Sequence, residues 1–255
     1  MIERKIYIEF YWSPNDSEIT KSLKEIAVFI STLFRYYLPK IKTKRTQKIN
    51  VELSRFETPY ENIYPVDVMN ADIIDVRTRF DFEHFDKLEL NAKKELLLIT
   101  IYQQLKLVFE RLEVNTEVLK ETYDKVLESD FTLALEPFGG TKLNRNKKIK
   151  ATVTAEYFIG YVLLSVSFFD KENKMIQKVK LFNTVPSGFI YLQLIQNAKW
   201  INNEIFQVFS RTKEFIFNVN VNGDVNTLYN PINETADDLK EKILLLTRGE
   251  VFIPN

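Results

Sequence analysis

The chain has a single histidine, His84, and it lies among carboxylates in the segment 81–86, Asp-Phe-Glu-His-Phe-Asp. A neutral imidazole beside carboxylates can bind a metal ion or share a proton, so His84, Asp81 and Asp86 are the weak candidates for a metal site. Metal ligands usually recur at helical or strand spacings, whereas phenylalanines at 80, 82 and 85 interrupt this segment. We therefore expect an irregular connection anchored by its aromatic side chains, with no bound metal and no cofactor.

The rest of the sequence offers little for a reaction mechanism. No Gly-x-Ser-x-Gly motif presents a serine nucleophile, and the lack of cysteine excludes thiol chemistry, disulfides and thiolate metal ligands. Paired-carboxylate chemistry stays open, because the chain has 35 acidic residues and the sequence does not show which two share a cleft. We expect a protein that is not an enzyme, with a metal- or carboxylate-dependent hydrolase acting near 81–86 as the alternative.

Acidic residues concentrate between positions 57 and 89, where they outnumber basic ones. This stretch could present a negative face to a basic partner protein, such as a nuclease toxin neutralised by an immunity protein. The leading hypothesis is therefore a non-enzymatic protein-binding module. Its candidate partner-binding residues are Asp67, Asp72, Asp75, Asp81, Glu83 and Asp86.

Two basic runs, 40–48 and 142–150, contain no acidic residue. Clusters of this kind can neutralise nucleic-acid phosphates, but the interleaved aromatic residues of a stacking platform are missing. A nucleic-acid-binding protein is therefore the third hypothesis, ranked below the other two. It would use Lys40, Lys42, Lys44, Arg45, Lys142, Arg145, Lys147 and Lys148.

Composition limits the class and compartment of the protein. With 45% hydrophobic residues among 255, the chain can bury a substantial core, and 35 basic against 35 acidic residues give no net charge. The N-terminus lacks the apolar core of a signal peptide, and no window is long and apolar enough to cross a membrane. We expect a cytoplasmic protein that does not enter membranes, and the abundance of Lys, Asn, Ile and Phe suggests an AT-rich bacterial or phage genome.

Hydrophobic periodicity predicts the elements that position these residues. Apolar residues at helical spacing predict a central pair of helices over about 91–129, with Asn91 as the first N-cap. An amphipathic helix at 19–37 ends before Pro39, and another at 235–249 begins with a capping box. Alternating apolar and polar residues predict strands near 6–12, 49–54, 74–80, 149–157, 162–168 and 175–181.

These elements predict an α+β fold, with an antiparallel β-sheet packed against the central helix pair and the two terminal amphipathic helices. The sheet is expected to be antiparallel because most of the predicted strands follow one another through short turns, such as Asn222-Gly223. We expect a single compact domain spanning 1–255. The alternative is two lobes, a mixed α/β lobe at 1–138 and a β-meander with a C-terminal helix at 148–255.

Overall fold

The computed structural model describes residues 2–4, 6–11, 21–43, 46, 48–55, 64–65, 73–138, 140–186, 191–230 and 247. The chain divides into two compact units, Met1–Thr132 and Leu133–Asn255, which we call the N-terminal and the C-terminal unit. This division lies close to the boundary of the two-lobe alternative. That the units act as a single domain stays a prediction. Among the described residues, no helix has the length and apolar character that a membrane span needs.

The N-terminal unit contains a small sheet in which three strands run parallel. Strand β2 (Tyr7–Tyr11) pairs with β4 (Lys48–Ser54), β4 pairs with β6 (Ile73–Arg79), and β5 (Tyr64–Pro65) joins β6 in the antiparallel sense. A separate two-stranded ladder joins β1 (Ile2–Arg4) to β3 (Ile41–Thr43). Helix α1 (Lys21–Tyr37) lies between β2 and β4 in the chain and forms part of their crossover connection.

The prediction of an antiparallel sheet is wrong for β2, β4 and β6. Two parallel neighbours need a crossover of a dozen or more residues, usually containing a helix. Helix α1 supplies the helix of this crossover, whereas its apolar periodicity predicted only that it packs on the core. The N-terminal unit therefore contains a strand–helix–strand unit that the alternation of residues within each strand did not reveal.

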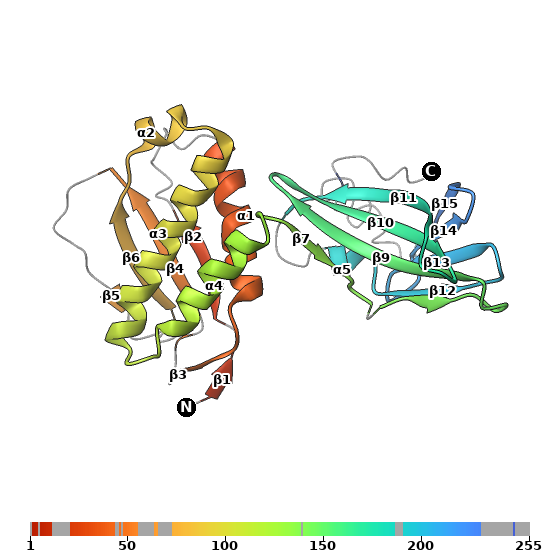
Figure 1. The fold of residues 1–255 in the computed structure, drawn as a ribbon, viewed down its shortest axis with the longest axis horizontal. Helices are drawn as coiled ribbons and strands as arrows, with labels where there is room; N and C mark the ends of the chain where they lie inside the picture. The colour runs from red at the N-terminus through yellow and green to blue at the C-terminus, as the bar shows by residue number, and fades with distance from the viewer. Residues whose placement is uncertain are drawn as a thin grey trace. The chain divides into compact units, whose positions relative to one another are not determined.

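Three helices of this unit pack on one another, as Figure 1 shows for α1, α3 (Leu90–Arg111) and α4 (Glu117–Glu128). Helix α1 contacts β2, and α3 contacts β4 and β6. Buried residues of α3 recur at helical spacing, so its apolar stripe forms part of the core: Leu97, Ile101, Leu105 and Val108. Both helices predicted over 91–129 are present, but the first begins at Leu90 and not after an Asn91 cap. The predicted C-terminal helix lies outside the described residues, apart from Thr247.

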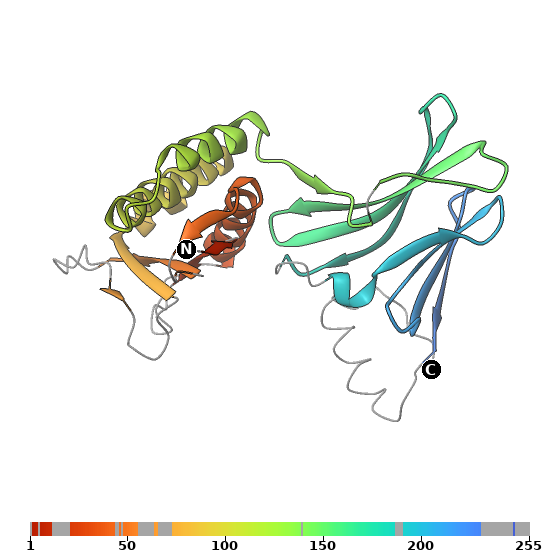
Figure 2. The ribbon, with the colours of Figure 1, turned by 90° about the horizontal axis from the view of Figure 1, so that it is seen from below.

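The C-terminal unit contains two antiparallel sheets, so the predicted meander is confirmed here (Figure 2). The strands of the first sheet are β7 (Leu133–Leu135), β8 (Lys142–Leu143), β9 (Ile149–Phe158), β10 (Tyr161–Asp170) and β11 (Met175–Thr184). They have the order β11-β10-β9-β7, and β8 pairs with another part of β9. The strands of the second sheet are β12 (Asn197–Trp200), β13 (Ile205–Phe209), β14 (Phe215–Asn220) and β15 (Val225–Tyr229). They have the order β12-β13-β14-β15, and the short helix α5 (Tyr191–Leu194) precedes them.

Aromatic side chains join the two sheets. The ring of Phe168 on β10 lies 5.7 Å from Trp200 and 6.4 Å from Phe206, measured between ring centroids. Phe182 on β11 lies 5.3 Å from Phe217 on β14. The four phenylalanine rings are almost fully buried and Trp200 is half-buried, so these rings supply much of the hydrophobic stabilisation of the unit. One face of each sheet therefore packs in the core between the two sheets.

We predict that Phe168→Ala destabilises the protein by about 3–5 kcal/mol, because it removes a fully buried ring that contacts both Trp200 and Phe206. Urea denaturation followed by tryptophan fluorescence measures the change. The matched control is Leu143→Ala, whose side chain is on the other face of the same sheet and is 50% exposed. A Phe168→Ala protein as stable as this control would contradict the packing described here.

Candidate interaction surface

The segment around His84 forms the short helix α2 (Phe82–Lys87) and not an irregular connection. Asp81 is its N-cap, and one carboxylate oxygen accepts a hydrogen bond from the His84 backbone N–H at 2.9 Å. Phe82 and Phe85 are buried against Phe80, which confirms the predicted aromatic anchoring. The side chains of Glu83, His84 and Asp86 are exposed. Within the described part of the chain, no three His, Asp or Glu side chains are grouped as metal ligands.

The structure describes four of the six acidic partner-binding candidates. Asp67 and Asp72 lie outside the described residues. Asp75 lies on β6, where it accepts a hydrogen bond from Asn50 Nδ2 at 2.6 Å. Three candidates come together on and beside α2, namely Asp81, Glu83 and Asp86. That the acidic residues form one negative face stays a prediction.

The two basic runs lie in different units. Lys40 and Lys42 are exposed in the N-terminal unit, and Lys44 and Arg45 lie outside the described residues. In the C-terminal unit, Lys142 Nζ donates to the backbone oxygen of Ala198 at 2.6 Å, so this lysine connects β8 to β12. The remaining candidates of that run are exposed in the turn between β8 and β9: Arg145, Lys147 and Lys148.

The register of the first C-terminal sheet also defines the sheet face opposite the core, which we call the outer face. Residues directly opposite on neighbouring strands share a face, and that face alternates along each strand. Phe168 points into the core, so Phe169 points outward, opposite Lys150 on β9 and Met175 on β11. Lys150 in turn lies opposite Leu143 on β8. The outer face therefore begins with a row across four strands.

The next rows of the outer face consist largely of small hydroxyl residues and charged residues. Thr152 lies opposite Ser167, which lies opposite Lys178, and Thr154, Ser165 and Lys180 form the row after it. Further along come Glu156 and Leu163, and then Phe158 and Tyr161, whose rings stack at 4.9 Å.

One ion pair crosses the middle of the outer face. Lys178 Nζ on β11 lies 2.7 Å from both carboxylate oxygens of Glu156 on β9. The line between these two residues passes over Ser165 on β10, because Ser165 occupies the row between them. Ser165 is buried although it belongs to the outer face, and so are Ser167 and Thr152 in the neighbouring row.

Exposed apolar side chains border this ion pair. Met175 is 53% exposed and Leu143 50% exposed in the first row, and Phe158 is 40% exposed at the opposite end. Single exposed apolar residues are normal, but three on one rigid sheet face form a surface of mixed apolar and charged character. Such surfaces are typical of protein interfaces, whose centres are apolar and whose rims are polar.

The outer face ends at a set of turns that are fixed to one another. The Asn144 side chain accepts hydrogen bonds from the backbone N–H groups of Lys148 and Ile149 and donates to the Asn203 backbone oxygen at 3.1 Å. Lys150 Nζ donates to the Lys171 backbone oxygen at 3.2 Å, which joins β9 to the β10–β11 turn. These contacts hold the turns of 144–148, 171–174 and 201–204 at one end of the unit.

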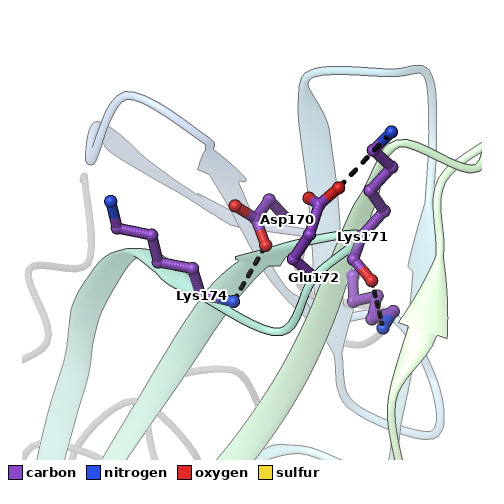
Figure 3. A network of polar contacts seen from close by, with 5 residues as sticks. Asp170, Lys171, Glu172 and Lys174 are labelled. Carbon is purple, nitrogen blue, oxygen red and sulfur yellow. Dashed lines mark hydrogen bonds and ion pairs between the residues drawn. The ribbon is translucent and has the colours of Figure 1, made fainter.

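Figure 3 shows the network within the β10–β11 turn. Asp170 accepts a hydrogen bond from the Lys174 backbone N–H at 2.8 Å, and Lys171 Nζ lies 3.4 Å from Glu172. Asn173 has a positive φ of 66°, a conformation that asparagine tolerates better than most residues. The charged ends of Lys171 and Lys174 therefore project from a defined turn, beside the basic turn of 144–148.

Comparison with protein-family models, with curated proteins and with solved structures finds no match for this chain. The candidate surface therefore rests on its own geometry. Leu143, Phe158 and Met175 were not predicted from the sequence, because they are neither charged nor catalytic residue types. For Phe158 the available signal was the alternation at 149–158, which separates an inward from an outward set of residues.

We predict that Asn144→Ala destabilises the protein by about 1–3 kcal/mol, since the Ile149 backbone N–H and the Asn203 carbonyl lose their side-chain partner, while the Lys148 N–H keeps only Asn146. Thermal or urea denaturation measures this change. The control is Arg145→Ala in the same turn, which removes an exposed side chain and should change stability by less than about 0.5 kcal/mol. Equal effects of the two substitutions would show that Asn144 does not organise the turns.

Proposed function

We propose that this protein is a non-enzymatic binding module that recognises another protein through the outer face of its C-terminal unit. The observation that carries the proposal is the placement of Leu143, Phe158 and Met175 on one sheet face around the Lys178–Glu156 ion pair. Apolar side chains supply the free energy of association, while the fixed charges select the partner. Sandwich-type sheets can present such a face without changing conformation.

The charge of the outer face favours an acidic partner. It carries Lys150, Lys178 and Lys180 against Glu156, and the adjoining turn adds Arg145, Lys147 and Lys148. The whole chain has no net charge, so this is a local excess of positive charge. The candidate basic toxin would instead require the acidic residues around α2, of which Asp81 is already engaged as a helix cap. An acidic protein surface with an apolar centre is therefore the better complement.

A nucleic acid could also contact the basic turn, but it would not use the exposed apolar residues. Binding dominated by phosphate contacts falls steeply with salt and tolerates changes in apolar side chains. Binding of a protein partner depends on both the salt concentration and the apolar side chains. The two classes of partner therefore differ in their response to salt and to an apolar substitution on the outer face.

We predict that Met175→Glu lowers recovery of the partner at least about tenfold, which corresponds to about 1.4 kcal/mol of binding free energy. The substitution places a negative charge on a side chain that is 53% exposed and lies opposite Phe169. The experiment uses the purified full chain as bait in lysate of its source organism, with quantitative mass spectrometry of the bound proteins.

The matched control is Leu107→Glu on α3, an apolar side chain of similar exposure in the N-terminal unit. It should leave recovery unchanged, while Lys147→Glu should weaken it and Lys125→Glu on α4 should not. The proposal would be contradicted if the Met175→Glu protein still bound the partner and the Leu107→Glu protein did not. A nucleic acid would instead be indicated if Met175→Glu did not change binding and if binding depended only on the salt concentration.

A further inference from the structure

A row of polar side chains crosses the parallel sheet of the N-terminal unit. Glu9 on β2, Asn50 on β4 and Asp75 on β6 lie directly opposite one another. Their neighbours in the chain, Ile8, Ile49, Ile74 and others, are buried on the face that carries the helices, so these three residues belong to the other face. Parallel sheets usually have apolar residues on both faces, and a polar row at the centre of one is therefore unusual.

Asn50 is the central residue of this row, and it is only 9% exposed. Its Nδ2 donates to Asp75 at 2.6 Å, whereas its Oδ1 is buried and has no hydrogen-bond partner among the described residues. Reversing the amide would not remove the problem, because it would place two oxygens 2.6 Å apart. A buried amide oxygen without a donor is costly, so it points to a missing positive or hydrogen-donating group.

Glu9 is the residue that can share such a group with Asn50. The amide nitrogen of Asn50 donates to Asp75, so the amide oxygen Oδ1 is directed away from Asp75. Glu9 occupies the opposite neighbouring strand, and its carboxylate is 34% exposed and paired with Lys48. Water and small ions therefore reach the Glu9 carboxylate, which belongs to the residue directly opposite Asn50 on the neighbouring strand.

We propose that Asn50 Oδ1 and the Glu9 carboxylate bind a hard divalent cation of the Mg²⁺ class, with Asp75 positioning the amide. Both ligands are oxygens, which suits Mg²⁺ or Ca²⁺ and not the softer metals that prefer nitrogen or sulfur. Magnesium sites commonly use one or two carboxylates and keep several water molecules, so two protein ligands on a partly exposed surface are sufficient. The role of Asp75 is that of a residue which orients a ligand by hydrogen bonding.

Lys48 competes with the cation for Glu9. Its ammonium group pairs with Glu9 in the present structure, and cation binding requires that this pair opens. Both side chains are partly exposed, so the ion pair contributes little to stability and opening it costs little free energy. Removing the lysine charge should therefore strengthen cation binding, which an ordinary structural role of this row would not explain.

The test measures Mg²⁺ and Ca²⁺ binding to the full chain by isothermal titration calorimetry and by the shift of thermal unfolding, after treatment with a chelator. The native chain should be stabilised by millimolar cation, because a ligand that binds only the folded state raises its stability. Glu9→Gln and the isosteric Asn50→Leu should lose this response. Asp75→Asn should weaken binding by roughly tenfold or more, and Lys48→Gln should strengthen it.

Two comparisons make the result decisive. Glu9→Gln changes a partly exposed side chain, so it tests the site even if Asn50→Leu folds poorly. Glu156→Gln removes one carboxylate charge from the C-terminal unit and should leave the response unchanged. The proposal is overturned if the native chain shows neither heat nor a thermal shift with either cation. It is equally overturned if Lys48→Gln responds no more strongly than the native chain.

Discussion

The antiparallel register of β9 and β10 is the constraint on which the account of this protein depends. The two strands pair over ten consecutive residues without interruption. Ala151 lies opposite Phe168 and Val153 opposite Val166, so these residues face the core together. A slip of one residue would exchange the two faces and expose the apolar set to water. The burial of Phe168 against the second sheet therefore also determines which residues form the outer face.

The edge of this sheet argues for recognition through the face and not through strand addition. Strand β11 is at the end of the described sheet order, and its pairing with β10 is interrupted at two register shifts. Bulges and exposed lysines such as Lys178 and Lys180 are features by which proteins prevent an edge strand from pairing with another chain. A partner therefore meets the side chains of the outer face more readily than the backbone of β11.

Much of the local structure followed from the sequence, because it depends on short-range periodicity. The alternation at 149–157 and 162–168 predicted the paired strands, and the spacing of Leu97, Ile101 and Leu105 predicted α3. The Asn222-Gly223 turn is also present, with Gly223 at a φ of +105° that glycine adopts without strain. These features need only a few neighbouring residues to be recognised.

The features that the sequence did not predict depend on contacts between distant segments. The parallel pairing of β2 with β4 follows from where α1 packs, and residue alternation is the same for parallel and antiparallel strands. Lys142 resembled the other lysines of its run, but the structure places its ammonium group on the Ala198 backbone oxygen 56 residues away. Charge runs therefore overestimated the exposed basic surface, and Met175 carried no signal because an exposed and a buried methionine look alike in a sequence.

The most direct test of the proposed outer face is oxidative footprinting of the chain, free and in complex with the partner that it captures. Met175 is well suited as a probe, because it is 53% exposed and its thioether oxidises readily. We expect Met175 and Phe158 to react several times more slowly in the complex, while Leu107 in the N-terminal unit reacts at the same rate in both. An unchanged rate at Met175, together with protection of residues in the N-terminal unit, would contradict the account.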